Sequence, residues 1–454
     1  MRAPAVAHAF ASAFRAKRHQ CWLVGGAVRD LYLGRPLSDL DIATDALPEE
    51  VMGMFRSVIP TGIKHGTVTV LSKGTRFEVT TFRTEAGYSD GRRPDAVAFV
   101  ATIEDDLARR DFTINAMALD LLSGRLEDPH GGRDDLGRRL VRAIGDPDAR
   151  FAEDGLRPVR ACRFAAQLDF AVDPATLAAI PRALATVARV SAERVRDELV
   201  KILASRAPSR GLRLMHEAGL LRLLVPELEA CAGVTQGELH CYDVLDHSLA
   251  ACDEAPPDDL VLRLAALLHD VGKPPRRAVA PDGRVTFYGH EQVSAELAES
   301  ILVRLRFPTD TVRTVRRLVA EHMFNYTEEW SDSAVRRLVA RVGEQLIDPL
   351  IALRRADAAG MCPGNGSRYP EALARFSDRV GAVRAGDRAF TVHELAIGGR
   401  EVMQRLGIGP GPAVGAILSA LLEAVLEDPA LNTPERLIDI AERLYRERIG
   451  IAKP

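Results

Sequence analysis

The chain has 454 residues, of which 47% are hydrophobic and 27% are charged, and its formal net charge is −3. A chain of this length forms several domains, and no uninterrupted apolar run approaches the roughly 20 residues that a membrane-spanning helix requires. The slightly acidic balance excludes a broadly basic surface, so any surface that binds nucleic acid must be local.

The first 20 residues are Ala-rich and lightly basic but contain no apolar segment of signal-peptide type. We expect an amphipathic helix there that leads into the first strand. The cysteines occur without a C-x-x-C pair, which predicts free thiols in a reducing compartment and no zinc ribbon. They are Cys21, Cys162, Cys231, Cys241, Cys252 and Cys362. These features favour a cytoplasmic protein.

Strand-like alternation of Val, Thr and Phe occurs only in the first third of the chain, whereas the pattern from about residue 148 onward is helical. The expected strands are 22–24, 40–43, 67–71 and 77–82, with 116–121 as a further candidate. The sequence therefore predicts a small α/β head on a long α-helical body.

The stretch Leu23–Thr44 carries the first chemical motif. Gly25-Gly26 follow a short apolar strand, and their missing side chains would let a phosphate approach the backbone amides, with Arg29 about one helical turn further on. Alternation along the next strand places the carboxylates of Asp39 and Asp41 on one face, as a Mg²⁺ site requires. An isolated Asp-x-Asp is usually a solvated turn, but its combination with GGAVRD predicts nucleotidyl transfer.

Later residues of the head add to this site. Glu78 lies on a neighbouring strand and is either a third metal carboxylate or an exposed strand residue, two equally good interpretations. The polar segment from Tyr88 to Pro94 predicts a mobile loop. In Arg109-Arg110-Asp111, an Arg beside an Asp can bind a triphosphate and a ribose hydroxyl, and Asn115 interrupts the apolar segment that follows.

A third motif is EDGLRPVRACRF. If it forms one helix, Asp154 and Arg157 share a face, with Arg160 and Arg163 on following turns. A carboxylate beside a guanidinium can hydrogen-bond the Watson–Crick edge of a base. The alternative is a surface ion pair worth a few tenths of a kcal/mol.

The motifs GGAVRD, DLDIAT, KHGTV, RRDFTINA, EDGLR-x-x-RACRFAAQL and SAERVRDEL, in this order, resemble those of class II tRNA nucleotidyltransferases, the family of bacterial CCA-adding enzymes and poly(A) polymerases. The resemblance covers about residues 23–203. It implies a nucleotidyltransferase head with a mixed β-sheet and an all-α neck. It also implies Mg²⁺ on Asp39 and Asp41, the triphosphate on Gly26, Arg29 and Arg110, and the ribose and phosphates beside Asp111 and Asn115. Asp154 and Arg157 would pair with CTP or ATP, supported by Arg160 and Arg163, and tRNA would be the acceptor.

A second constellation lies in the helical body. His247 precedes an expected helix, His269-Asp270 end an apolar run, and His290, His322 and Asp357 follow at long separations. This set resembles the HD phosphohydrolase domain, in which such side chains converge on one or two divalent metals that activate water. Imidazole-rich ligands favour Ni²⁺, Mn²⁺ or Co²⁺. The alternative is a retained fold without activity; His240 matches no ligand position.

The tail begins after the Gly/Pro-rich segment MCPGNGSRYP. Its Gly407, Gly409, Gly411 and Gly415 open a helix N-terminus suited to a backbone phosphate, as in the tRNA-contacting tail of HD-containing CCA-adding enzymes, or form a tight turn between helices. We therefore predict four domains: a catalytic head at 1–140, a helical neck at 141–225, an HD domain at 226–362 and a helical tail at 363–454.

The expected function is addition of the CCA end to tRNA from CTP and ATP, with an appended HD phosphohydrolase. Poly(A) polymerase and an A-adding enzyme are alternatives, while the loop at 88–94 argues against CC-only addition, since by resemblance such enzymes shorten it. A different class of function would be a metal-dependent phosphohydrolase whose head only binds RNA. The sequence leaves the oligomeric state open.

Overall fold

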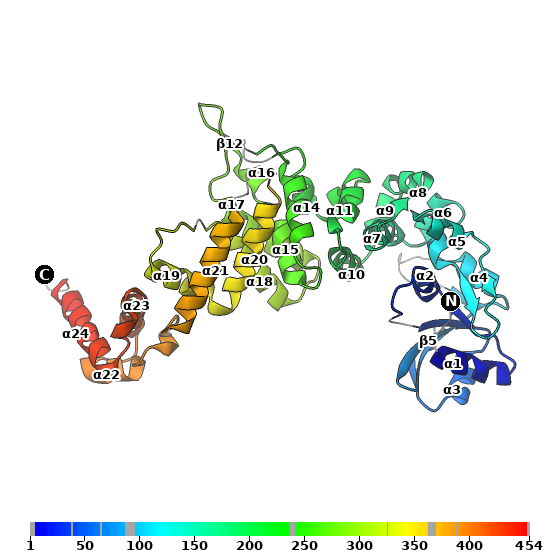
Figure 1. The fold of residues 1–454 in the computed structure, drawn as a ribbon, viewed down its shortest axis with the longest axis horizontal. Coiled ribbons are helices and arrows are strands. Elements are labelled where there is room, and N and C mark those ends of the chain that lie inside the picture. Colours follow the sequence, from blue (N-terminus) through cyan, green and yellow to red (C-terminus); the bar gives the residue numbers. More distant parts are fainter. Residues whose placement is uncertain are drawn as a thin grey trace. The chain divides into compact units, whose positions relative to one another are not determined.

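The computed structural model describes residues 5–37, 40–63, 66–86, 96–236, 241–324, 326–361, 369–386 and 389–451. The chain divides into two compact units, residues 1–229 and 230–454, which are described separately. Figure 1 shows the first unit in blue to green and the second in green to red. No helix in the described ranges has both the length and the apolar character needed to span a membrane.

The first unit contains a seven-stranded sheet with the strand order β3-β4-β5-β2-β1-β8-β9. Strands β2 and β5 are parallel and the other neighbours are antiparallel, so the predicted mixed sheet is confirmed. The strands are β1 (Trp22–Val24), β2 (Leu40–Thr44), β3 (Val58–Gly62), β4 (Thr67–Ser72), β5 (Thr75–Thr81), β8 (Ala118–Asp120) and β9 (Leu126–Glu127). A separate antiparallel pair consists of β6 (Arg83–Ala86) and β7 (Ala96–Phe99).

The two faces of this sheet differ because side chains alternate along each strand. Leu40 and Ile42 of β2 are buried beside Phe77 and Val79 of β5. The Phe77 ring stacks on Phe10 of the amphipathic helix α1 (Ala5–Ala16), with ring centres 3.8 Å apart. This face is therefore the core, and the alternate positions of β2 and β5 face away from it.

Short helices complete the head, and a helical neck follows it. The head helices are α2 (Gly26–Tyr32), α3 (Pro48–Met54), α4 (Ile103–Ala108) and α5 (Gly132–Gly137), with the 3-10 turn η2 (Thr113–Asn115). The neck helices are α6 (Pro147–Glu153), α7 (Arg157–Leu168), α8 (Pro174–Ala179), α9 (Leu184–Val187), α10 (Ala192–Leu203), α11 (Pro208–Glu217), α12 (Leu220–Leu224) and α13 (Pro226–Glu229).

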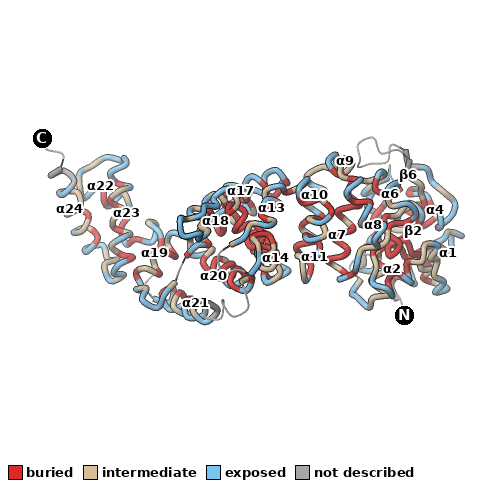
Figure 2. The backbone as a smooth tube through the Cα atoms, turned by 90° about the horizontal axis from the view of Figure 1, so that it is seen from above, coloured by how far each residue is buried: buried red, intermediate tan, exposed pale blue. Residues whose placement is uncertain are grey.

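The second unit is almost entirely helical, and its helix α14 is buried over most of its length (Figure 2). Its first helices are α14 (Val244–Glu254), α15 (Leu260–Leu268), α16 (Lys273–Arg276), α17 (His290–Arg304), α18 (Thr309–Glu321), α19 (Asp332–Val342), α20 (Glu344–Ala359) and α21 (Tyr369–Ala385). The chain then forms α22 (Gly399–Leu406), α23 (Pro412–Glu427) and α24 (Pro434–Ile451), which share a core built around Leu421 and Leu437.

Strands also occur beyond the first third, so the expectation that confined them there is wrong. Among the described residues, three strands lie beyond it: β11 (Ala171–Val172), which pairs in parallel with β10 (Leu140–Val141), and the hairpin of β12 (Ala278–Val279) and β13 (Val285–Thr286) in the second unit. Each has only two residues, too few for an alternating pattern to be visible in the sequence.

The expectation of six free thiols is wrong at Cys241, which is in a disulfide. The absence of a C-x-x-C pair excludes only a partner close in sequence. Cys162 and Cys252 are buried thiols, and burial raises the pKa of each to about 12.

Candidate active sites

The first unit contains a polar cavity of about 390 Å³ where the head meets the neck. Most residues that the sequence singled out for nucleotide binding line it. They are Gly25, Gly26, Arg29, Asp41, Arg110, Asp111, Asn115, Asp154, Arg157, Arg160 and Arg163, joined by Arg109, Phe164 and Arg194. Eleven residues from separate motifs thus surround one space.

The glycine turn after β1 lies against an arginine. Gly25 has φ +66°, and a Cβ atom there would come within 2.8 Å of the Arg110 Nη1 atom. An L side chain is therefore strained by the backbone conformation and would require the guanidinium to shift. The turn places backbone amides at the start of α2 beside a cation, an arrangement that suits a phosphate.

One carboxylate of the sheet, that of Asp41, lines the same cavity, and Glu78 does not belong to the lining. Asp41 pairs with Glu78 in the register of the parallel strands β2 and β5, so the two side chains leave the sheet on the same face. Glu78 is exposed, which leaves its oxygens available to a hard cation. Asp39 lies outside the described residues, as do Lys64 and His65 of the KHGTV motif and the loop at 88–94.

A chain of hydrogen bonds links head to neck across the cavity. Arg29 Nη1 donates to Asn115 Oδ1 at 2.8 Å, and Asn115 Nδ2 donates to Asp111 Oδ1 at 3.0 Å. Arg160 of α7 donates from Nε to Asp111 Oδ2 at 2.8 Å. Burial opposes the charge of Asp111, but Arg160 and the hydrogen bond from Asn115 outweigh it and hold the pKa of this carboxyl below its usual range. Asp111 is therefore an ionised acceptor.

Sequence reasoning missed the residue that orients the two arginines. Asp106 is 1% exposed, and it accepts from Arg109 Nη2 at 2.8 Å and from Arg110 Nη2 at 3.1 Å. Its Oδ1 also accepts from the backbone N–H of Arg83, the first residue of β6, at 3.4 Å. Burial opposes the charge, but the two arginines lower the pKa of Asp106. The available signal was the i,i+3 and i,i+4 spacing to the arginine doublet.

The proposed base-reading pair lines the cavity, but not as predicted. Asp154 and Arg157 do not share a helix, because α6 ends at Glu153 and α7 begins at Arg157. A continuous helix would bring the Pro158 ring against the carbonyl of Asp154, four residues earlier. Gly155 occupies the break, where a Cβ atom would lie 2.5 Å from the Thr186 carbonyl oxygen.

Asp154 and Arg157 also do not pair with each other, contrary to the alternative of a surface ion pair. Asp154 Oδ2 accepts from Arg194 Nη2 of α10 at 2.8 Å, whereas Arg157 donates to the backbone carbonyls of Arg109 at 2.9 Å and Arg150 at 2.8 Å. Arg157 also pairs with Glu153. The sequence did not identify Arg194 as a site residue, although it belongs to the SAERVRDEL motif.

A buried glutamate, Glu198, positions Arg163 of α7. Glu198, 2% exposed, lies 2.5 Å from Arg163 Nε and accepts from Lys201 at 3.1 Å. Burial lowers the pKa of Arg163 to about 10. The Arg163 guanidinium lies over the Phe164 ring, 3.9 Å from its centre, and is thereby held on the cavity side of α7.

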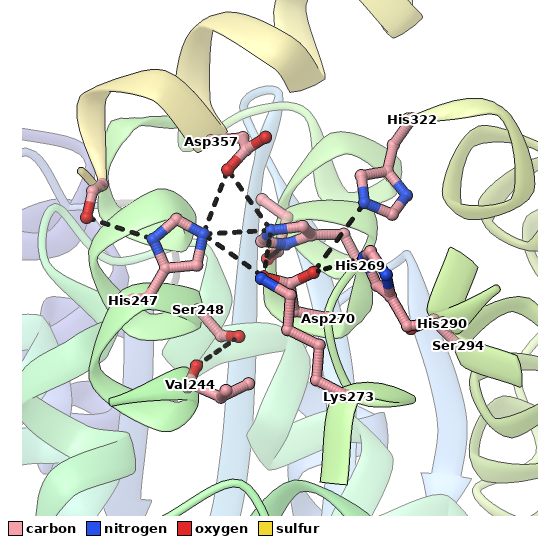
Figure 3. A network of polar contacts seen from close by, with 12 residues as sticks. Val244, His247, Ser248, His269, Asp270, Lys273, His290, Ser294, His322 and Asp357 are labelled. Atoms are coloured by element: carbon pink, nitrogen blue, oxygen red, sulfur yellow. Dashed lines mark hydrogen bonds and ion pairs between the residues drawn. The ribbon is translucent and has the colours of Figure 1, made fainter. Parts of the chain in front are cut away.

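The second unit brings together all six residues of the predicted HD constellation, which come from α14, α15, α17, α18 and α20 or their ends (Figure 3). His247 lies inside α14 rather than before a helix, contrary to the prediction. Each of the six is at most 6% exposed. Two overlapping groups have ligand atoms within 4.8 Å of one another, namely His247, His269 and Asp357, and His269, Asp270 and His322.

The imidazoles are oriented alike. The Nδ1 atom of each histidine faces a backbone carbonyl, at 3.1 Å for His247, 2.8 Å for His269, 2.9 Å for His290 and 2.6 Å for His322. Such contacts select the tautomer that leaves Nε2 without a proton, as a metal ligand requires. The buried Nε2 of His290 makes no hydrogen bond of good geometry and lies 3.2 Å from Asp270 Oδ1. The donor set therefore fits a divalent metal.

The carboxylates of this cluster carry the negative charge. Asp270 Oδ2 lies 3.2 Å from His269 Nε2, and Asp357 Oδ1 lies 3.0 Å from His247 Nε2. Burial opposes a charge on His269, but the two carboxylates raise its pKa to about 10, whereas burial and the neighbouring His269 lower the pKa of His322 to about 3. The two carboxylates therefore favour a positive charge beside His269, whereas His322 stays neutral.

Comparison with known proteins gives three matching family profiles. They are the poly(A) polymerase head domain over residues 21–142, the probable RNA- and SrmB-binding site of polymerase A over residues 169–231, and the HD domain over residues 238–361. Nucleotidyltransferases and HD proteins are metal-dependent, in agreement with the ligand groups described above.

Two curated relatives align over nearly their whole length. The CCA-adding enzyme of Levilactobacillus brevis is 35% identical over 423 residues, which are 92% of this chain and 93% of the relative. The A-adding tRNA nucleotidyltransferase of Deinococcus radiodurans is 38% identical over 441 residues, which are 94% and 96% of the two chains. The match to the CCA-adding enzyme of Geobacillus stearothermophilus, in contrast, covers 50% of that relative's length.

A solved structure has the same fold over nearly the whole chain. The crystal structure of the Bacillus stearothermophilus CCA-adding enzyme in complex with CTP superimposes with a TM-score of 0.76 at 30% identity and covers 98% of both chains. The residues that line the cavity, the family profiles and these alignments all indicate the same family. The chain belongs to the class II tRNA nucleotidyltransferase and bacterial poly(A) polymerase family, and it carries an HD domain.

Proposed function

We propose that this protein adds C, C and A to the 3′ ends of tRNA, using CTP and ATP and no nucleic-acid template. The observation that supports this proposal most strongly is that one cavity is lined by a glycine turn suited to phosphate, by the carboxylate of Asp41 and by two groups able to read a base edge. We also propose that it acts in the cytoplasm, where tRNA is processed.

Different residues are assigned to binding the triphosphate, the ribose and the metal. Gly25, Gly26, Arg29 and Arg110 bind the triphosphate, while Asp111 and Asn115 receive the ribose. Asp39 and Asp41 would hold Mg²⁺, with Glu78 as a further oxygen ligand. When bound, Mg²⁺ lowers the pKa of the attacking hydroxyl and neutralises charge on the leaving group. The tRNA 3′-hydroxyl gives up its proton to water, and its oxygen bonds to the α-phosphorus. The bond from that phosphorus to the oxygen bridging the α- and β-phosphates breaks, and pyrophosphate leaves.

Base selection is assigned to Asp154 and Arg157, which offer an acceptor and a donor at the neck side of the cavity. Arg160 and Arg163 stabilise that wall through Asp111 and Glu198. Since the donors and acceptors belong to the protein, selection of CTP and ATP requires no template strand.

Addition of A alone is the second candidate, because the full-length Deinococcus radiodurans relative bears that name. Synthesis of poly(A) is a third possibility within the family. The three activities can be distinguished by which nucleotides are incorporated into tRNA acceptors with defined 3′ ends. CCA addition predicts incorporation of labelled CTP into tRNA that lacks its whole CCA end, and of ATP into tRNA ending in CC. An A-adding enzyme incorporates only ATP, on tRNA ending in CC, and a poly(A) polymerase extends with repeated A.

For the second unit we propose a metal-dependent phosphohydrolase. His247, His269, Asp270, His290, His322 and Asp357 would hold one or two borderline metals such as Ni²⁺, Mn²⁺ or Co²⁺, given four imidazoles and two carboxylates. A bound metal supplies an activated water and a Lewis acid at the phosphate. Candidate substrates are 2′,3′-cyclic and terminal phosphates of RNA, which block the hydroxyl that the head uses.

The experiment for this second activity is phosphate release, or opening of a cyclic nucleotide, across a metal series. The double variant His269→Ala, Asp270→Ala should lose this activity and retain incorporation of CTP and ATP, because these residues lie outside the first unit. Absence of hydrolysis with every metal, together with no bound metal in elemental analysis, would leave the HD fold as a scaffold.

A further inference from the structure

A cavity of about 610 Å³ adjoins the HD cluster. Its lining includes the ligand residues Asp270, His290, His322 and Asp357 together with larger, less polar side chains. A volume of this size accommodates a nucleotide and exceeds what a lone phosphate needs. The cavity therefore raises the question of what fills the part that lies away from the ligands.

Two of the most exposed apolar side chains of the described residues belong to this lining. Tyr288 is 83% exposed and Met323 is 57% exposed. Tyr288 precedes the ligand His290 by two residues, and Met323 directly follows the ligand His322. Single exposed apolar residues are ordinary, but two at one cavity, each within two residues of a histidine of the HD cluster, indicate a contact surface.

The turn that carries Tyr288 is held to the cluster. The Phe287 carbonyl accepts from the backbone N–H of His290 at 3.1 Å and faces His290 Nδ1 at 2.9 Å. Lys273 Nζ, which donates to Asp270 Oδ2 at 2.6 Å, lies 5.6 Å from the centre of the Phe287 ring. The backbone of Tyr288 therefore has a fixed position relative to two predicted ligands.

We propose that Tyr288 is a platform on which a nucleobase stacks, with Met323 beside it, so that the HD site takes the phosphate esters of nucleosides, such as a 2′,3′-cyclic phosphate at an RNA 3′ end. This inference rests on the proposed phosphohydrolase. An aromatic face binds any base, because every base presents a π surface, so the site selects for a nucleoside without selecting a sequence. In the reaction, a water oxygen bonds to phosphorus, the P–O bond to one ribose oxygen breaks, and that oxygen takes the proton, which gives a monoester.

The test compares two cyclic diesters in the full-length, metal-loaded protein. Adenosine 2′,3′-cyclic phosphate carries a base, whereas glycerol 1,2-cyclic phosphate presents the same five-membered ring without one. Tyr288→Ala should raise KM for the adenosine compound about tenfold or more, from the usual range for base–aromatic stacking, and leave its kcat nearly unchanged. Hydrolysis of the glycerol compound should not change, and Tyr288→Phe should behave as wild type.

A binding measurement gives an independent readout. The affinity of adenosine 3′-phosphate, measured by calorimetry, should fall by the same factor in Tyr288→Ala. Tyr242→Ala is the matched control, since Tyr242 is 40% exposed in the same unit and does not line the cavity. Equal effects on both diesters, or no effect of Tyr288→Ala on KM and affinity, would overturn the platform. If the wild type hydrolyses neither diester, the proposed phosphohydrolase fails, and the binding comparison alone decides whether Tyr288 binds a base.

Discussion

Arg194 Nη2 donates to Asp154 Oδ2 at 2.8 Å, so the carboxylate assigned to base reading is positioned by a helix that follows it by forty residues. Both side chains line the nucleotide cavity and are about 20% exposed. A base that uses Asp154 as an acceptor must therefore fit beside this ion pair or displace it. Arg157 is positioned independently, through the backbone carbonyls of Arg109 and Arg150.

Loss of either base-reading group should reduce the choice among nucleotides more than the binding of triphosphate. In Asp154→Ala or Arg157→Ala, a base edge is left without its partner inside the cavity, at a cost of about 1–3 kcal/mol. The measurement is kcat/KM for CTP, ATP, UTP and GTP. If either variant discriminates as well as the wild type, base selection lies elsewhere.

Arg194→Ala should act on selection through Asp154. The change releases the carboxylate from its position, so discrimination should fall in the single variant and fall little further in the double variant with Asp154→Ala. A double-mutant cycle on kcat/KM measures this coupling. Arg189→Ala, which removes an exposed arginine before α10, is the control. Additive losses in the cycle would show that Arg194 acts separately.

Asp41→Ala should abolish incorporation while tRNA binding survives, because the change removes an oxygen ligand and leaves the basic residues of the neck in place. Asp39→Ala should behave likewise. Glu49→Ala, which removes an exposed carboxylate on α3, is the control. Retention of even a tenth of wild-type incorporation by both aspartate variants would contradict the assignment.

Asp106→Asn should raise KM for both CTP and ATP, because Arg110 loses the carboxylate that orients it. It should also lower the free energy of unfolding by about 2 kcal/mol, as expected for hydrogen bonds to charged groups. Since the pKa of Asp106 is lowered in the folded state, its contribution is present above the ordinary value of 3.8 and lost as the pH falls through the folded-state pKa. The stability difference between variant and wild type should therefore shrink in acid.

Kinetics with each nucleotide and denaturant unfolding at several pH values check this prediction. Asp105→Asn changes the adjacent, exposed carboxylate and should have little effect on either quantity. An unchanged KM in Asp106→Asn would show that Arg110 keeps its position without the aspartate.

The sequence predicted those parts of the site that depend on local spacing. The glycine turn, the position of Asp41 and the residues of the HD cluster follow from neighbours in the chain or from recurrent motifs. The ion-pair partner of Asp154 could not be predicted in this way. Arg194 reaches Asp154 because α10 packs against α7, and this packing cannot be inferred from the sequence alone. The break between α6 and α7 was foreseeable, since Pro158 disfavours a helix through Asp154.

Sequences of the 3′ ends made by the wild-type protein test the central proposal most directly. The substrate is tRNA lacking its CCA end, with all four nucleoside triphosphates present at equal concentration. The account predicts that nearly every extended molecule ends in CCA and that extension stops there. Ends that carry runs of A, or mixtures that include U and G, or no extension at all, would contradict it.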